Sequence, residues 1–331
     1  MSVSPVAVSV CRRSGQLPAS LRYGHGMRSR LFSMVALAGL TMAGCGGSSD
    51  AVPGEATLPP APAPAASSTS TTVTALTTIT TIPTTTTTTT ATTTTINPFA
   101  RPGWLGTRPL PLRPDEHGEV QPTPPELVDR RLATPADLPP PSSAEFEWTV
   151  KPVPADVLAR SSWVPECPVA VDELAYVTVS HVGFDGGIHT GELLVNTRWA
   201  EGVVEVFRRL FEAAFPIEQM RIIRAEEIDA PPTGDWNDTT SFVCRPAVGN
   251  TSWSQHAYGL AIDINPFHNP YLKGDLVLPE LATSYTDRDN LRSGMIQPGD
   301  VVVSAFAEMG WPWGGNWNTL KDWMHFSASG G

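Results

Sequence analysis

Residues 252–266 read Ser-Trp-Ser-Gln-His-Ala-Tyr-Gly-Leu-Ala-Ile-Asp-Ile-Asn-Pro, and the second half of this segment alternates in character. Its aliphatic side chains fall on one face of an extended strand, because successive side chains point to opposite faces. Asp263 falls on the other face, beside the small Ala261. A carboxylate half-buried in a strand is costly without a partner. The pattern predicts a strand whose Asp has a cation beside it, with His256 as a nearby candidate ligand.

A second segment that carries chemistry lies near the end of the chain, where residues 320–326 read Leu-Lys-Asp-Trp-Met-His-Phe. Asp322 and His325 would face opposite sides of a regular strand, so a turn or bulge must separate them if both serve one site. His256, Asp263 and His325 together form a His/Asp/His set. Catalytic zinc takes three protein ligands of this kind and keeps a fourth position for water.

The order Ser-x-His-x-x-Gly-x-Ala-x-Asp, followed by Asp-Trp-x-His-Phe, resembles a family of zinc peptidases. These are the D-alanyl-D-alanine carboxypeptidases and L-alanyl-D-glutamate endopeptidases, whose fold is shared with lysostaphin-like peptidases and the hedgehog domain. The resemblance covers about residues 167–326, including Phe-x-Cys-Arg at 242–245 and Gly-Trp-x-Trp-Gly-Gly at 310–315. It implies a hydrolase that cuts peptide bonds in the stem peptides of peptidoglycan.

The resemblance also implies a role for each matching residue. His256, Asp263 and His325 would bind Zn²⁺, Asp322 would be the catalytic carboxylate, and Arg245 would polarise the scissile carbonyl. Several relatives have Glu where this chain has Asp322. The bond that is cut stays open between a D-Ala-D-Ala carboxypeptidase, an L-Ala-D-Glu endopeptidase and a crosslink endopeptidase.

Each of these roles has a simpler structural alternative. Asp322 could pair with the neighbouring Lys321 at the surface, and Arg245 could pair with a structural carboxylate. The whole domain could be a catalytically inactive, zinc-containing module that binds the cell wall. Such a module would have no reason to keep Asp322 and Arg245, so their presence favours the enzyme.

Strands and helices are interspersed between residues 146 and 331 without a regular βαβ rhythm, which predicts an α+β domain with a central antiparallel sheet. Alternation predicts strands, and helical spacing predicts helices. The strands are expected at 174–179, 191–196, 221–228 and around 262–264, with a turn at 185–187. The helices are expected at 203–214 and at 301–309, where Gly310 would end the second.

The four cysteines of the chain indicate the redox compartment in which the protein works. Cys11 is expected to be absent from the mature protein and Cys45 to carry lipid, which leaves Cys167 and Cys244 as an even pair for an oxidising compartment. A disulfide between them would close a loop of about 77 residues, stabilise the fold by about 4 kcal/mol in the chain-entropy model, and hold Arg245. Two free buried thiols are the alternative.

The N-terminus predicts export. Arginines precede an apolar stretch that is too short to span a membrane, and residues 1–44 are interpreted as a signal peptide, with Met27 as an alternative start. The run Leu-Thr-Met-Ala-Gly-Cys at 40–45 resembles a bacterial lipobox. We expect lipid on Cys45, and a protein anchored to the outer face of the membrane towards the wall. An ordinary cleaved signal with a chance Cys is the alternative.

Residues 45–145 are rich in Thr and Pro and are assigned to a disordered linker, because they offer little apolar surface to bury. Within them, residues 101–145 are either linker or an extended arm packed on the domain, with one short helix at 125–132. The zinc peptidase domain is assigned to 146–331. The chain has a formal charge of −11, although its first 44 residues contain five Arg and no acid, so the acidic remainder argues against nucleic acid as a partner.

Overall fold

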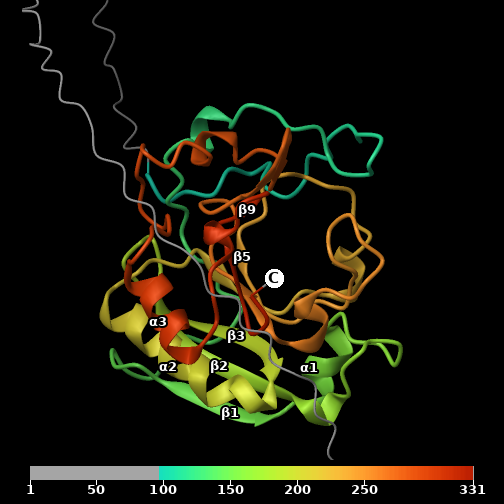
Figure 1. Ribbon diagram of the computed structural model, residues 1–331. Coiled ribbons are helices and arrows are strands. Elements are labelled where there is room, and N and C mark those ends of the chain that lie inside the picture. The colour runs from blue at the N-terminus through green and yellow to red at the C-terminus, as the bar shows by residue number, and fades with distance from the viewer. Residues whose placement is uncertain (1–96, 331) are drawn as a thin grey trace, which may run out of the picture. The chain divides into compact units, whose positions relative to one another are not determined.

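The computed structural model describes residues 97–330, so the signal peptide, Cys45 and the linker up to residue 96 lie outside the described part. Within it, short helices and antiparallel strands are mixed, as Figure 1 shows. This arrangement is consistent with the α+β class that the sequence predicts. Among the helices of this part, none combines the length and hydropathy needed to cross a membrane.

The largest sheet contains three antiparallel strands in the order β1-β2-β3, with bounds Trp148–Pro152, Leu174–Val182 and Ile188–Asn196. β2 and β3 pair over nine residues each, and Gly186 takes a positive φ of 75° in the turn that joins them. Both strands expected here are confirmed, and the turn at 185–187 is confirmed too. Apolar side chains at alternate positions of β2 and β3 enter the main core.

One helix lies on this sheet, and a second helix packs against the first (Figure 1). α2 (Ala200–Glu212) buries an apolar stripe at helical spacing, and α3 (Val301–Met309) packs against it. Asp300 caps α3, since its carboxylate accepts from the N–H of Val303, and Gly310 ends it with a φ of 88°. The stripe on α2 and the end of α3 agree with the sequence pattern.

The remaining elements are short. The paired strands are β6 (Ala261–Asp263) with β10 (His325–Ser327), β7 (Tyr271–Lys273) between β8 (Leu276–Leu278) and β9 (Lys321–Asp322), and β4 (Gln219–Met220) with β5 (Asp238–Thr239). The helices are α1 (Ala155–Arg160) and the 3-10 turns η1 to η7 at Pro125–Leu127, Val171–Glu173, Thr197–Trp199, Ala225–Glu227, Gln255–Tyr258, Thr283–Tyr285 and Gly314–Asn316.

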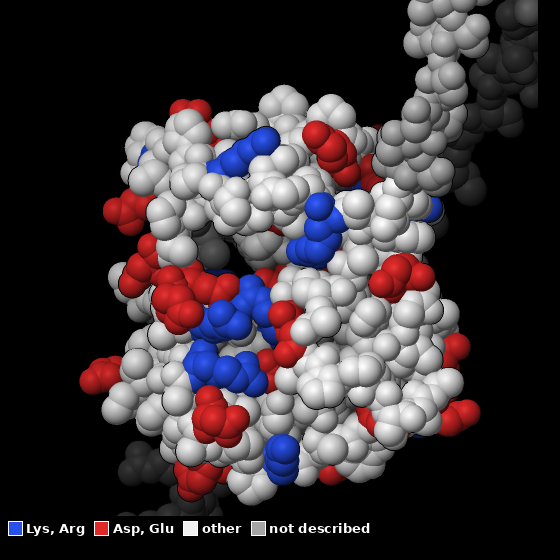
Figure 2. Space-filling view, turned by 180° about the vertical axis from the view of Figure 1, so that it is seen from behind, with Lys and Arg blue, Asp and Glu red and all other residues white. Residues whose placement is uncertain are grey.

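The strand expected at 221–228 is wrong. This segment is irregular and contains the turn η4. Arg221 lies inward and donates to the carboxylates of Glu227 and Asp238, so the backbone curls around an ion-pair network and does not extend along a sheet edge. On the face seen in Figure 2, acidic and basic side chains likewise lie beside one another around a hollow.

Residues 97–145 pack on the domain as an extended arm, which is one of the two alternatives that the sequence left open for residues 101–145. Only η1 of the helix expected at 125–132 forms. Arg130 of the arm is 1% exposed and makes a two-pronged ion pair with the buried Glu218, with both N–O distances 2.7 Å. Arg101 and Asn237 also donate to Glu218. Composition could not decide between the two alternatives, because the partners of the arm lie about 90 or more residues away.

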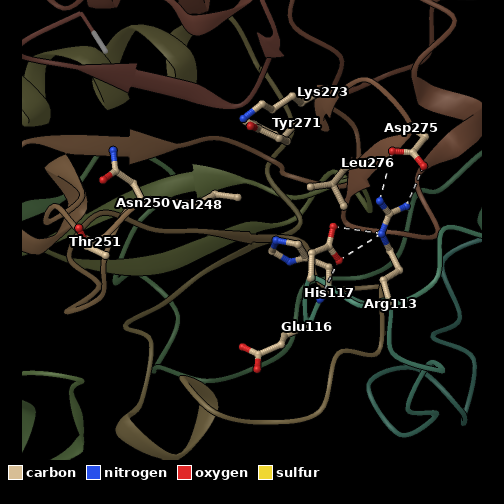
Figure 3. Close-up of a pocket in the computed structure, with 12 residues that line it drawn as sticks. Arg113, Glu116, His117, Val248, Asn250, Thr251, Tyr271, Lys273, Asp275 and Leu276 are labelled. Carbon is tan, nitrogen blue, oxygen red and sulfur yellow. Dashed lines mark hydrogen bonds and ion pairs between the residues drawn. The ribbon is translucent and has the colours of Figure 1, made fainter.

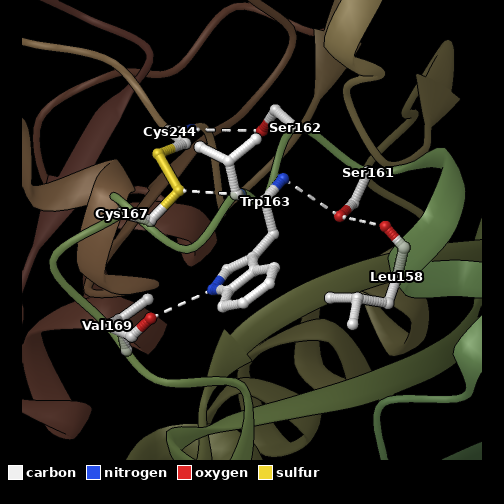
Figure 4. Close-up of a disulfide and its surroundings, with 8 residues drawn as sticks. Leu158, Ser161, Ser162, Trp163, Cys167, Val169 and Cys244 are labelled. Atoms are coloured by element: carbon white, nitrogen blue, oxygen red, sulfur yellow. Dashed lines mark hydrogen bonds between the residues drawn. A yellow bond between two sulfur atoms is a disulfide. The ribbon is translucent and has the colours of Figure 1, made fainter.

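Cys167 and Cys244 form a disulfide (Figure 4). The backbone N–H of Val164 also donates to the sulfur of Cys167, and the N–H of Cys244 donates to the hydroxyl of Ser162, 3.1 Å away. The two cysteines therefore form the predicted disulfide and are not two free buried thiols. The bridge ties the segment before β2 to the residue that precedes Arg245.

The buried ion pair predicts a strong effect of its removal. Arg130→Met leaves the buried Glu218 with only Arg101 and Asn237 as partners, so we expect the free energy of unfolding to fall by up to about 3–5 kcal/mol, the range for a fully uncompensated buried charge. Urea unfolding measures this loss. Arg131→Met removes an exposed arginine next to it and should change stability little. Equal effects of the two substitutions would show that the pair does not hold the arm.

Candidate active site

Three residues that the sequence singles out converge at one point. β6 and β10 pair antiparallel with Asp263 directly opposite His325. His256 lies in η5, which is capped by Ser254, whose hydroxyl accepts from the N–H of His256. Gly259 ends η5 with a φ of 65°, and a Cβ there would lie 2.7 Å from the backbone N of Asn196. Glycine is required at that turn because the chain passes so close to β3.

The side-chain atoms of these three residues form a small triangle. Nε2 of His256 lies 3.2 Å from Nδ1 of His325 and 3.2 Å from Oδ2 of Asp263, while Nδ1 of His325 lies 3.0 Å from Oδ1 of Asp263. All three residues are buried. Two imidazoles and a carboxylate in this arrangement could hold a metal ion.

The triangle fits zinc in both size and chemistry. Ligand bonds of about 2.0–2.1 Å in a tetrahedron separate neighbouring donor atoms by about 3.3 Å, close to the spacings found here. Nδ1 of His256 lies 2.5 Å from the carbonyl oxygen of Ser241, so this nitrogen donates and leaves Nε2 free as a ligand. Burial alone raises the pKa of Asp263, but His256 and His325 outweigh it and lower the pKa below its ordinary value.

Asp322 lies at the end of β9, and a bend at residues 323–324 separates it from His325 in β10. The turn that the spacing required is therefore present. Oδ1 of Asp322 is shielded from solvent and has no hydrogen-bond partner. Burial raises the pKa of Asp322 to about 7; Asp263 acts in the same direction, whereas His325 and Arg245 oppose it. An unpaired carboxyl with this pKa is suited to accept and release a proton.

The surface ion pair considered for Asp322 does not form. The ammonium of Lys321 donates to the carbonyls of Gly315 and Trp317, at 3.1 and 2.7 Å. A Cβ at Gly314 would lie 2.6 Å from the carbonyl oxygen of Asp322, so glycine at this position lets the preceding turn approach β9 closely. These contacts hold the backbone on both sides of the carboxyl group while leaving that group unpaired.

Arg245 is half-buried and acts on the same carboxyl. Its charge lowers the pKa of Asp322, and its guanidinium donates to the carbonyl of the adjacent Pro246. Within the described residues it makes no ion pair with a structural carboxylate, so the structural alternative for Arg245 has no support there. The disulfide at Cys244 holds its backbone.

Two further residues near the site differ in their roles. His268 is fully buried and bonds the carbonyl of Arg130 and the amide of Asn237, so it is part of the core. Tyr271 was not singled out by the sequence, yet it lies opposite Asp322 in the β7–β9 pairing. Burial and then the charge of Asp322 raise the pKa of Tyr271. Only strand register reveals this neighbour.

Comparison with known proteins supports a peptidase. Residues 248–328 match the model of a family described as D-alanyl-D-alanine carboxypeptidase. The matched segment contains His256, Asp263, Asp322 and His325, and it begins three residues after Arg245. No curated protein and no solved structure matches the chain. The matched segment is thus similar to this family of peptidases, while the arm and the disulfide lie outside it.

The raised pKa of Asp322 predicts how stability depends on pH. In the metal-free protein, the folded state keeps a proton that an Asp of ordinary pKa 3.8 releases, so this residue costs stability as pH rises from about 4 to about 7. Asp322→Asn cannot ionise. We expect it to melt at a higher temperature than wild type above pH 7 and at a similar temperature near pH 4.

Thermal unfolding of both proteins in chelator, between pH 4 and pH 8, measures this difference. Asp172→Asn, at an exposed position, controls for the loss of one charge. A difference between Asp322→Asn and wild type that stayed constant across the range would contradict the shifted pKa.

Proposed function

We propose that this protein is a zinc metallopeptidase that hydrolyses peptide bonds in peptidoglycan stem peptides. The observation that carries the proposal is the compact His256, Asp263, His325 triangle with the unpaired carboxyl of Asp322 nearby, all within the segment that matches D-alanyl-D-alanine carboxypeptidases. Bound Zn²⁺ would supply a Lewis acid that polarises water and the substrate carbonyl.

The residues of the chain would divide the remaining work. Asp322 accepts the proton of the attacking water and passes it to the leaving amine. The guanidinium of Arg245 donates to the carbonyl oxygen as negative charge develops there. Asp263 keeps its negative charge beside the side chains of His256 and His325, and the charged carboxylate is the form that cation binding requires.

Export and anchoring belong to the same proposal. A protein that acts on the wall must cross the membrane, and the signal at 1–44 with lipid on Cys45 would provide both export and attachment. The Thr- and Pro-rich stretch would then span the distance from the membrane to the substrate. The disulfide between Cys167 and Cys244 agrees with an oxidising compartment.

Metal binding tests the triangle. We expect about one Zn²⁺ per chain in purified protein, measured by elemental analysis, and a stoichiometry near zero in His325→Ala because two ligands bind zinc far more weakly than three. Asp322→Asn should retain the metal, since Asp322 is not a ligand. Loss of zinc in Asp322→Asn would assign Asp322 to the metal and contradict the proposed roles.

Activity tests the chemistry. Purified muropeptides incubated with the zinc-loaded protein should give products whose masses identify the cleaved bond. Asp322→Asn should lower turnover by about 10²–10⁴-fold, the usual contribution of a general base. Zinc-loaded wild type that bound wall fragments and released no product would favour the inactive, wall-binding module.

A further inference from the structure

A large cavity, shown in Figure 3, is lined by Tyr271, the residue that pairs with Asp322 of the proposed active site. Its volume is about 870 Å³, and three separate segments line it. One is the loop at 248–251, the second is the hairpin of β7 and β8, and the third is the turn at 113–117 of the arm. The loop begins three residues after Arg245 and ends five residues before His256, so its two ends lead directly into the site.

The floor of the cavity is continuous with the site through the β8-β7-β9 sheet. Tyr271 pairs with Asp322, and Lys273 pairs with Leu276. Directly paired residues, and residues two apart on a strand, point to the same face of a sheet. Asp322, Tyr271, Lys273 and Leu276 therefore share one face, whereas Leu272 on the other face packs into the core.

The arm forms a wall of this cavity and is tied in place. Arg113 bonds Asp115 within its own turn and Asp275 in the β7–β8 hairpin, with N–O distances of 3.2–3.3 Å. The N–H of Gly118 donates to the carboxylate of Glu280 at 2.8 Å, and that carboxylate is buried. The turn is therefore attached to the hairpin that carries Lys273.

The charges around the cavity leave one cation without a partner. Arg113 is matched by two carboxylates, but Lys273 makes no ion pair with any residue that the structure describes. Figure 3 shows Glu116 and Lys273 on opposite sides of His117, so the exposed acid of the turn is not directed at the ammonium. The ammonium of Lys273 can therefore pair with a ligand.

We propose that this cavity is a substrate subsite in which Lys273 binds a carboxylate of the peptide about two residues from the scissile bond. The distance follows from the strand, since Lys273 lies two residues, about 6.8 Å, from the position level with Asp322. The inference rests on the proposed peptidase function. It adds a preference for acidic peptides, with the arm as the wall that encloses them.

Paired peptides test the subsite. Stem peptides with a free carboxylate, and the same peptides with that carboxylate amidated, are given to the zinc-loaded full chain. We expect wild type to cleave the carboxylate form with a kcat/KM about 3–10-fold higher, the range of a charge-assisted contact that water partly screens. Lys273→Gln should abolish this preference, and Lys273→Arg should largely retain it.

Lys151→Gln is the matched control, because it removes an exposed lysine of β1 that does not line the cavity and whose ammonium lies over the ring of Tyr176. Calorimetry measures recognition apart from turnover. It compares the binding of the same peptides to zinc-loaded Asp322→Asn and to the zinc-loaded double variant that also carries Lys273→Gln.

The outcomes separate the two proposals. Cleavage by wild type with an unchanged carboxylate preference in Lys273→Gln overturns the subsite and leaves the peptidase standing. Absence of both cleavage and binding for every stem peptide overturns the peptidase and the subsite together. Loss of the preference in Lys273→Gln alone, with Lys151→Gln unaffected, establishes the subsite.

Discussion

The antiparallel pairing of β6 with β10 is the constraint on which the site depends. It sets Asp263 against His325 although 62 residues separate them in the chain. A shift of the strand register by one residue would turn one of the two side chains to the other face, and the three candidate metal ligands would no longer lie together. The core enforces the register, because Ile262 and Phe326 pair in the same two strands and are fully buried.

The site brings together two buried carboxyl groups, and burial disfavours the charged form of each. Asp263 and Asp322 are close enough to influence each other, and neither has a lysine or arginine bonded to it. The imidazoles stabilise the charge of Asp263, whereas Asp322 holds a proton more readily than an ordinary carboxyl group. This contrast suits one carboxylate to hold a cation and the other to transfer protons. The buried Arg130–Glu218 pair shows the opposite solution, full neutralisation by direct contact.

Segments distant in sequence frame this site. The disulfide holds the backbone before Arg245, the arm lies along the β7–β8 hairpin, and Gly314 lets a turn reach Asp322. The arm lies outside the residues that match the peptidase family. The chain therefore places residues of its own beside a site whose central residues resemble a known family.

Local patterns determined much of this protein. The alternation around Asp263, the spacing of Asp322 and His325, and the helical stripe ending at Gly310 are properties of neighbouring residues, so the strands, the bend, the helix and the candidate ligands followed from the sequence alone. The disulfide partners followed from counting the cysteines that were expected to remain in the mature protein. Tertiary structure alone decided that Tyr271 lies beside Asp322, that 221–228 curls around Arg221, and that the arm packs through Arg130. Each of these depends on a partner brought near by the fold, and periodicity carries no information about such contacts.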